Sequence, residues 1–440
     1  MKGRVGITAV LCTVAALGVF LVPMDMSPEA HKALAISVWM ILFWIFAPID
    51  HAITGIAGCF LYWATGAVDF EAAFHGFAQD TPWLIFGALL LGMMMATSGL
   101  AVRLAYSAMS VIGVSYGRLL MALIVVDFLM TFVIRSGVAR VVILASIAIG
   151  VVNAFGIGTK SNISRGLFVI VPYAATIFDR TLTVGRTSAV GYLPADLITV
   201  LACWAAVMWL YPPEQKELAR GRSYIDLQLS KLGPVTSLEK RGAILMAVTI
   251  GLWMTEPIHY VSPAMIGMGA ALAACLPKIG VINPEEFKRV DPLPILLAGA
   301  MLSMAAVLTE TKAIEVVHTS LFSTVQPLMT SVNSSALVLY PAGFINNFFL
   351  PAPDNISASM PLVMRLAEDN SLKPLAVFMI WTFAAAGKLF IYQSPVFVVG
   401  YSYGRFEAKD LLKIGLVLTL VEAVVLILLV SLYWPLIGIL

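Results

Sequence analysis

Ionisable residues interrupt several apolar stretches of this 440-residue chain. A charge at the centre of a bilayer costs about 2.5–3.5 kcal/mol on insertion scales, so such residues ordinarily face a cavity or a charged partner. A surplus of two positive charges would suit a doubly charged anion, because arginine can hold a carboxylate or sulfonate through two parallel hydrogen bonds. The set comprises five basic residues, Arg135, Arg140, Arg180, Arg186 and Lys388, and three acidic residues, Asp127, Asp179 and Asp354.

The same charges could instead serve the fold alone, by neutralising one another between packed helices. Both interpretations stay open for any single residue of the set. Lys388 is a strong candidate for a binding role because it interrupts an otherwise apolar helix between Ala384 and Tyr392. The structural pairings that we consider are Asp179 with Arg180 or Arg186, and Asp127 with Arg135 or Arg140.

The composition is that of a membrane protein. The chain is 60% hydrophobic and 12% charged, with a mean hydropathy of +0.93, which lies far outside the range of soluble domains. The net charge of +2 is too small to indicate a nucleic-acid partner. Neither the four cysteines nor the five histidines have the spacing of a metal site, so we expect no metal and no cofactor.

Eleven apolar segments have about the length of a membrane-spanning helix. Two further apolar stretches, near 118–157 and 331–364, are interrupted at residues 135–137 and 351–354. Irregular backbone at membrane depth is tolerated only inside protein or beside a wet cavity, so we expect two re-entrant hairpins near a site. The eleven segments lie near residues 6–23, 33–49, 52–67, 82–100, 166–185, 188–211, 243–258, 261–277, 293–309, 374–392 and 414–436.

The distribution of lysine and arginine predicts the orientation of these segments. With the N-terminus in the cytoplasm, the inward loops hold 18 lysines and arginines and the outward loops hold four. Positive residues accumulate on the cytoplasmic side of membrane proteins. We therefore expect a multi-pass protein of the inner (plasma) membrane with its C-terminus outside, and hairpins that enter from opposite sides, the first from the cytoplasm.

Short motifs recur in the same order in the two halves of the chain. Because five crossings separate the copies, they must have opposite orientations, which indicates an inverted repeat typical of alternating-access transporters. Chance similarity between apolar helices is the alternative, and the ordered Trp, Pro and Gly landmarks argue against it. The matched segments are 43–50 with 252–259, 66–71 with 280–285, and 83–88 with 295–300. The predicted organisation is a first helix and outer loop (1–32), repeat 1 (33–211), a cytoplasmic linker (212–242) and repeat 2 (243–440).

These landmarks resemble the divalent anion:sodium symporter family, which transports dicarboxylates, citrate or sulfate. The resemblance covers nearly the whole chain and is strongest over residues 394–415, which are similar to the segment after the last broken helix of that family. It implies an all-α polytopic protein with about 11 transmembrane helices and two re-entrant hairpins. It also implies a homodimer, in which a scaffold domain forms the interface and a transport domain holds the hairpins and two broken helices.

The motifs at the expected site depart from the family pattern. A Ser-Asn-Thr triplet stands at each hairpin tip in the family, whereas residues 135–137 here read Arg-Ser-Gly and residues 351–353 read Pro-Ala-Pro. The turns of the two broken helices correspond to residues 185–188 and 392–395. The resemblance therefore implies substrate binding by Arg135, Ser136, Gly137, Arg186, Thr187, Ser188, Asn355, Gln393 and Ser394. The remaining charges, Asp127, Arg140, Asp179, Arg180, Asp354 and Lys388, would form a charge or coupling network.

The expected function is secondary transport of a small anion, a dicarboxylate or similar dianion, by an elevator-type mechanism. The coupling ion would be sodium or a proton. A fixed guanidinium or ammonium in place of the bound sodium would instead give a sodium-independent exchanger or a proton-coupled carrier. An anion channel is a further alternative, although hairpins from opposite faces favour alternating access. An enzyme would need a nucleophile with a base, or a metal cluster, and the sequence shows neither.

Overall fold

The computed structural model describes residues 2–113, 115–183, 186–214 and 222–440, and the side chains of residues 5–113, 115–179, 190–214 and 225–440. Within these ranges every element is a helix. Contacts divide the chain into two compact units, each of which is described by itself. Unit 1 comprises Met1–Pro82, Leu293–Ser394 and Thr419–Leu440, and unit 2 comprises Trp83–Pro292 and Pro395–Leu418.

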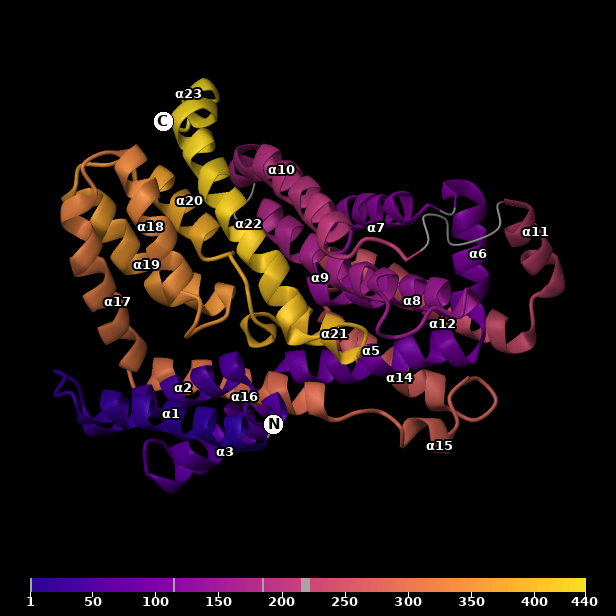
Figure 1. Cartoon of the computed structure of the whole chain (residues 1–440), viewed down its shortest axis with the longest axis horizontal. Helices are drawn as coiled ribbons and strands as arrows, with labels where there is room; N and C mark the ends of the chain where they lie inside the picture. The colour runs from indigo at the N-terminus through magenta and orange to yellow at the C-terminus, as the bar shows by residue number, and fades with distance from the viewer. Residues whose placement is uncertain (1, 114, 184–185, 215–221) are drawn as a thin grey trace. The chain divides into compact units, whose positions relative to one another are not determined.

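Unit 1 begins with three helices, α1 to α3, which are followed by the short helices α4 and η1. It continues with helices from the second half of the chain (Figure 1). The short helices α4 and η1 dock against the long helix α16, where the Gly76 amide donates to Ser303 Oγ at 2.9 Å. The elements are α1 (Lys2–Leu21), α2 (Pro28–Phe46), α3 (His51–Ala64), α4 (Phe70–Ala73), η1 (His75–Ala78), α16 (Leu293–Glu310), α17 (Ala313–Val325), η2 (Gln326–Leu328), α18 (Val332–Asn346), α19 (Ala352–Asp369), α20 (Pro374–Ala384), η3 (Ile391–Gln393), η4 (Leu429–Tyr433) and α23 (Trp434–Leu436).

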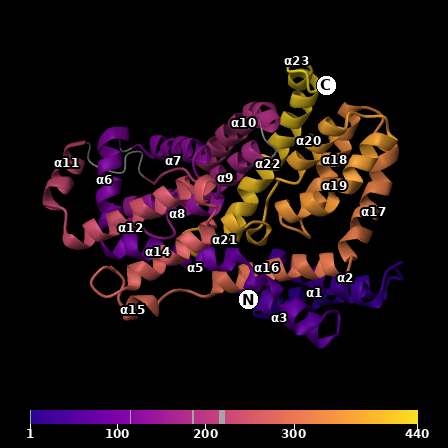
Figure 2. The same cartoon turned by 180° about the vertical axis from the view of Figure 1, so that it is seen from behind.

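Unit 2 holds most of the first half of the chain. Its helices α12 and α14 lie side by side, as do α9 and α10 (Figures 1 and 2). The elements are α5 (Asp80–Thr97), α6 (Leu100–Ile112), α7 (Tyr116–Thr131), α8 (Gly137–Ala154), α9 (Asn162–Thr183), α10 (Arg186–Leu210), α11 (Arg222–Lys231), α12 (Ser237–Met254), α13 (Glu256–His259), α14 (Pro263–Cys275), α15 (Pro284–Phe287), α21 (Pro395–Ser402) and the start of α22 (Ala408–Leu428).

Six helices in the described residues are long and apolar enough to cross a membrane. Five of them coincide with predicted spans, namely Pro28–Phe46, Asp80–Thr97, Val190–Leu210, Leu293–Glu310 and Ala408–Leu436. The sixth, Gly137–Ala154, belongs instead to the first predicted hairpin. The other predicted spans form helices that are shorter, more polar or broken, so the count of eleven crossings stays a prediction.

Both segments that we expect to form hairpins contain two helices with a short break between them. The breaks are residues 132–136 between α7 and α8, and residues 347–351 between α18 and α19. They overlap the interruptions found in the sequence at residues 135–136 and at Pro351, whereas Gly137 and residues 352–354 already belong to α8 and α19. Two helices of 13 residues each, α6 and α17, precede these pairs and were missed by the sequence analysis, because they are too short to satisfy a search for membrane spans.

The openings of the two predicted repeats share a contact pattern. Trp44 Nε1 donates to the His51 carbonyl at 2.9 Å, and Trp253 Nε1 donates to the Pro263 carbonyl at 3.1 Å. In both cases the indole bridges the connection from its own long helix to the next long helix, α2 to α3 and α12 to α14. The match between residues 43–50 and 252–259 stays a prediction.

Each of these helix pairs packs against a helix from the other half of the sequence. A Cβ atom added at Gly55 of α3 would lie 2.5 Å from Ala300 Cβ of α16. A Cβ atom added at Gly87 of α5 would lie 2.8 Å from the Gly267 carbonyl carbon of α14. Glycine permits both close approaches, as small residues do between membrane helices. The two compact units therefore do not coincide with the predicted repeats, because each unit contains segments from both repeats.

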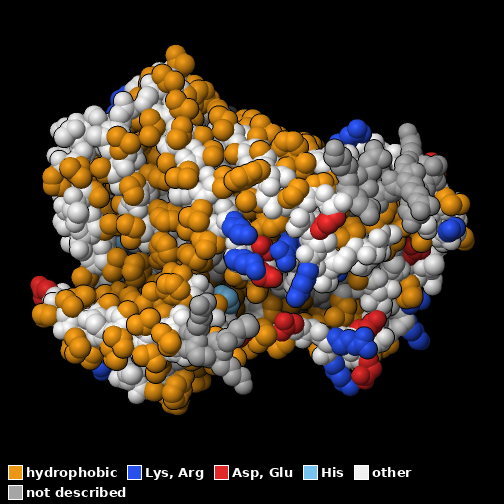
Figure 3. All heavy atoms as spheres, viewed as in Figure 1, with side chains coloured by type: hydrophobic (Ala, Val, Ile, Leu, Met, Phe, Trp, Pro, Cys, Tyr) orange, Lys and Arg blue, Asp and Glu red, His pale blue; other side chains and the backbone are white. Residues whose placement is uncertain are grey.

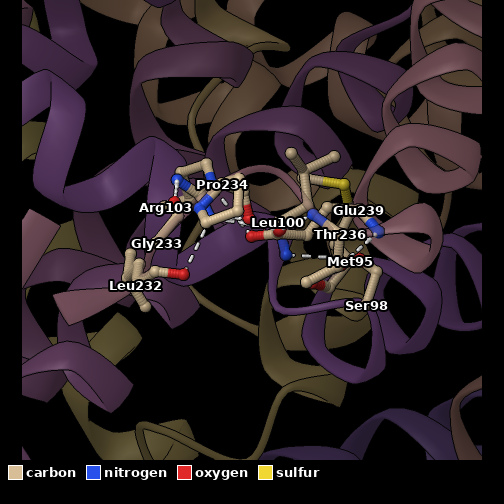
Figure 4. Close-up of polar contacts among 9 residues, drawn as sticks. All are labelled: Met95, Ser98, Leu100, Arg103, Leu232, Gly233, Pro234, Thr236 and Glu239. Atoms are coloured by element: carbon tan, nitrogen blue, oxygen red, sulfur yellow. Dashed lines mark hydrogen bonds and ion pairs between the residues drawn. The ribbon is translucent and has the colours of Figure 1, made fainter. Parts of the chain in front are cut away.

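The predicted linker is tied to α6 by a single arginine. Arg103 donates from Nε to Glu239 Oε1 at 2.7 Å and from Nη2 to Oε2 at 3.2 Å, while Nη1 donates to the Gly233 carbonyl (Figure 4). Glu239 also forms a capping box with Thr236 at the start of α12. Arg103 thus joins the end of α11 to the beginning of α12.

Candidate functional site

The break that we predict to be the tip of the first hairpin lies in unit 2, at the start of α8, and we call it the first tip. Ser136 is the N-cap residue, with extended backbone, and its hydroxyl accepts from the Ala139 amide at 3.3 Å. Gly137 follows as the first residue of the helix. An N-terminus of this kind presents free amide groups and the positive end of the helix dipole, which favour an anion.

One buried arginine organises this tip. The side chain of Arg140 is fully buried and donates from Nε to Asp127 Oδ1 of α7 at 3.0 Å and from Nη2 to Asp179 Oδ1 of α9 at 2.8 Å. Its remaining hydrogen bonds go to the carbonyls of Ile134 (3.1 Å) and Ala175 (2.8 Å). The guanidinium therefore fastens α7, α8 and α9 together, and it also fixes the break before α8.

The two carboxylates that hold Arg140 differ in their surroundings. Asp127 is fully buried, and its Oδ2 has no hydrogen-bond partner among the described residues. Asp179 is 35% exposed, and a Cβ atom added at Gly137 would lie 2.5 Å from its Oδ2. The Asp179 carboxylate thus occupies the space beside the helix N-terminus that any larger residue at position 137 would fill.

The structure separates the predicted basic residues of this region. Arg135 is exposed in the break, whereas Arg140 is the arginine that pairs with Asp127, as one of the two pairings from the sequence had it. The pairing of Asp179 with Arg140 was not among those that we considered. The predicted residues Arg180, Arg186, Thr187 and Ser188 lie outside the side chains that the structure describes.

The break that we predict to be the tip of the second hairpin lies in unit 1 and is built from amides, and we call it the second tip. Asn355 Nδ2 of α19 donates to Asn347 Oδ1 at 3.0 Å, and Asn347 Nδ2 donates to the Gly387 carbonyl at 2.8 Å. Asn346 Nδ2 contacts both Asn355 Oδ1 and, at 2.8 Å, Nε2 of His318 on α17. All four side chains of this amide network are buried. It links α17, α18 and α19 to the chain that follows α20.

The segment after α20 interrupts the helix, and hydrogen bonds of the predicted residue Gln393 stabilise this break. Gln393 Oε1 accepts from the amides of Leu389 at 2.7 Å and Phe390 at 2.8 Å, while Gln393 Nε2 donates to the Asn347 carbonyl at 3.2 Å. Ser394 is buried next to it, and Lys388 is half-buried within the break. The structure therefore brings Asn355 and Gln393 together through Asn347.

A groove of about 590 Å³ opens beside the second hairpin within unit 1. Asp354 and Ser357 of α19 line it together with His75, Thr309 and Glu310. Two carboxylates and no lysine or arginine in the lining make this groove suited to cations more than to anions. Asp354, which we expected in a charge network, faces this groove.

The sequence analysis gave little weight to the residues that organise the second tip. The sequence leaves open whether Asn346 and Asn347 orient the backbone of the predicted hairpin or cap a helix end, and it places His318 at the end of a span. Consecutive asparagines before a proline-rich break in an apolar segment were the available signal. Asn346 Oδ1 and His318 Nδ1 are buried without a hydrogen-bond partner among the described residues. Amide and carbonyl oxygens are ligands for hard cations, so this tip has donor atoms suited to a coupling cation.

Within the described ranges, no three His, Cys, Asp or Glu side chains converge as metal ligands do. Comparison with known protein families identifies the family of this chain. The family model described as the sodium:sulfate symporter transmembrane region matches residues 4–187 and 181–440. The chain belongs to the sodium:sulfate symporter family. The resemblance inferred from the sequence is thereby confirmed, and the chain is a multi-span helical transporter, not an enzyme.

Relatives of this transporter cover most of its length at low identity. A sodium-dependent dicarboxylate transporter, SdcS of Staphylococcus saprophyticus, is 22% identical over 463 residues, or 94% of this chain and 88% of that protein. The chloroplastic dicarboxylate transporter 2.1 of Arabidopsis thaliana is 24% identical, with 85% of this chain and 72% of that protein covered. A protein of Cupriavidus necator known only as a membrane protein is 26% identical, with shares of 83% and 77%.

Proposed function

We propose that this member of the sodium:sulfate symporter family is a secondary active transporter of a small dianion, with dicarboxylates as the first candidates. The observation that carries the proposal is the family match over residues 4–440, together with relatives that are named dicarboxylate transporters. In this proposal the chain works by an elevator-type mechanism as a homodimer in the inner membrane, with its N-terminus in the cytoplasm and its two repeats inverted.

Both hairpin tips support a binding role. Each places the N-terminus of a helix, α8 or α19, at a break in an apolar segment, and helix N-termini favour anionic groups. The predicted residues Ser136 and Gly137 stand at one tip, and Asn355 and Gln393 at the other. We propose that the helix N-terminus at each tip, taken by itself, can hold a negatively charged group.

The coupling mechanism has two candidate forms. Sodium coupling is favoured by the amide and carbonyl oxygens of the second tip, which match the ligand preferences of a hard cation. The first tip favours a fixed cation instead, because the Arg140 guanidinium already bridges two carboxylates there. A carrier with a permanent cation at this tip would need no sodium at it, and could exchange anions or move them with a proton.

Uptake into proteoliposomes tests the function and the coupling together. Labelled succinate and labelled sulfate would be offered under a sodium gradient, a pH gradient, or an internal load of unlabelled succinate. We expect saturable uptake of at least one anion above that of protein-free vesicles. Uptake of neither anion under any gradient would overturn the proposal.

Two variants separate the coupling forms. Arg140→Lys keeps the charge while losing the planar fork, and Arg135→Gln removes an exposed charge from the same hairpin. A fixed-cation mechanism predicts sodium-independent uptake that falls in Arg140→Lys and persists in Arg135→Gln. A steep sodium requirement that both variants retain contradicts the fixed-cation form.

A further inference from the structure

A group of basic side chains outside both hairpin tips gathers on one face of unit 2. Figure 3 shows these Lys and Arg side chains near the junction between α21 and α22, with acidic side chains among them. Its members come from the chain just before α9 and the first turn of α9, and from the chain just before α22 and the first turns of α22. We name it the basic patch and define it as Lys160, Arg165, Arg405, Lys409 and Lys413.

The acidic groups near the basic patch are already engaged. Glu407 accepts from Lys409 Nζ at 2.6 Å and lies 3.6 Å from Arg165 Nη2. Lys409 first, with Arg165 and Lys160 at longer range, holds the pKa of the Glu407 carboxyl below its usual value. Asp410 is buried, and it accepts from Tyr211 Oη at 2.9 Å and from the Glu407 amide at 2.8 Å.

One further acid, Glu214, is used by the backbone. Its carboxylate accepts from the amides of Asn162 and Ile163, and so caps the N-terminus of α9. Five basic residues therefore face three acidic ones, which leaves a surplus of two positive charges.

Arg405 contributes one of these surplus positive charges. Its guanidinium carbon stands 5.8 Å from the centre of the Phe168 ring, and the side chain is half-buried. Among the residues that the structure describes, Arg405 has no carboxylate partner. A guanidinium that is partly removed from water, stacked on an aromatic ring and left without an acid retains its N–H donors for an external anion.

The position of the lysines indicates the source of that anion. Lys409, Lys413 and Leu416 follow one another at intervals of four and three residues, so they share one face of α22. Lys409 and Lys413 are exposed, and Leu416 is 50% exposed. The apolar face begins where the lysines end, on a helix that is long and apolar enough to cross a membrane. Basic residues at such a boundary lie at the level of lipid headgroups.

We propose that the basic patch binds the phosphate headgroup of an anionic phospholipid in the leaflet that faces the cytoplasm. The phosphate oxygens accept from Arg405, Lys409 and Lys413, and an acyl chain follows the exposed face of α22 from Leu416. A soluble oxyanion would satisfy the same donors, but it would gain nothing from the apolar continuation of that face.

Lipid retention by the full-length protein tests this proposal. The protein would be placed in nanodiscs of phosphatidylcholine with increasing fractions of phosphatidylglycerol, and bound lipid would be counted by native mass spectrometry. A basic residue near an anionic leaflet contributes about 1 kcal/mol, so Lys409→Gln with Lys413→Gln should weaken phosphatidylglycerol binding about 30-fold. Lys409→Arg with Lys413→Arg should retain it.

A matched pair elsewhere provides the control. Lys240 and Arg241 are exposed at the start of α12 and lie outside the basic patch. Lys240→Gln with Arg241→Gln changes the net charge equally and should leave binding unchanged. Equal loss in this control would show a general effect of charge and would overturn the proposal.

Soluble anions distinguish the two sources. Inorganic phosphate, sulfate and succinate at the same concentration should not raise the thermal unfolding midpoint through the basic patch. The lipid assignment is overturned if one of them does so in the unaltered protein and fails to do so in Lys409→Gln with Lys413→Gln. It is also overturned if the glutamine variant retains phosphatidylglycerol as the unaltered protein does.

Discussion

The breaks at the first and second tips are both held by buried polar side chains, but the chemistry of these side chains differs. At the first, a buried guanidinium joins three helices through two carboxylates and two carbonyls. At the second, a chain of neutral amides joins the helices through asparagine, histidine and glutamine side chains. Removing one member of a buried ion pair strongly lowers stability, because the other member is left as an unpaired charge in the interior. Neutral amides lose single hydrogen bonds, which cost less.

The largest expected effect comes from breaking the first tip. Arg140→Gln leaves Asp127 buried without its cation, and we expect a loss of about 3–5 kcal/mol in stability. The thermal unfolding midpoint in detergent measures it. Arg135→Gln, five residues earlier and exposed, should change stability by no more than about 0.5 kcal/mol. Adding Asp127→Asn to Arg140→Gln should recover part of the loss. Equal midpoints for the two arginine variants would contradict the assignment of Arg140 as the organising residue.

The second tip should respond less to the same kind of test. Asn347→Ala removes the acceptor of Asn355 and the donor to the Gly387 carbonyl, at an expected cost of about 2–3 kcal/mol. Asn333→Ala, at an exposed position of α18, serves as the reference and should have little effect. A cost for Asn347→Ala above that for Arg140→Gln would reverse the comparison between charged and neutral tips.

A smaller change probes the space beside the first tip. Gly137→Ala places a methyl group where the Asp179 carboxylate lies, so that carboxylate must move away from Arg140. We expect a stability cost of about 1–2 kcal/mol and a lower rate of anion uptake. Gly251→Ala, where an added Cβ meets nothing within 4 Å, is the control. Unchanged uptake in Gly137→Ala would show that the position of Asp179 does not affect transport.

We expect the smallest effect for the ion pair between Arg103 and Glu239, which lies outside the predicted spans. Its contribution to stability provides a comparison for the Arg140 cluster. Hydrogen bonds from Arg103 lower the pKa of the Glu239 carboxyl below its ordinary value of 4.5. The stabilisation is therefore fully present above pH 4.5 and is lost as the pH falls through the lowered pKa. It should amount to about 1 kcal/mol or less. Unfolding midpoints between pH 6 and pH 3 should fall less steeply in Glu239→Gln; parallel curves would remove Glu239 as the titrating group.

Local signals in the sequence predicted the helix breaks. Pro351 is the N-cap residue of α19 and Ser136 is the N-cap residue of α8, and both residue types favour the non-helical side of a helix start, so both breaks follow from neighbouring residues. The choice between Arg135 and Arg140 required the third dimension. Only the packing of α8 between α7 and α9 shows that position 140 faces inward while position 135 stays in the break.

The partners of the second tip could not be predicted for a related reason. His318 lies on α17, a helix too short and too polar to appear in a search for spans, and it meets Asn346 from 28 residues away. The exchange of segments between units was also hidden. Sequence repeats report ancestry and orientation, whereas compact units report contact, and here the two do not coincide.

The close packing of α3 against α16 has a consequence for biosynthesis. Gly55 can reach its neighbour Ala300 only after a further 245 residues have been made, which takes roughly 12–50 s at usual rates of translation. During that interval the glycine face of α3 must rest against lipid or another protein. The early helices of this transporter therefore enter the membrane before their permanent partner exists, and a chain released before residue 300 would lack the means to complete unit 1.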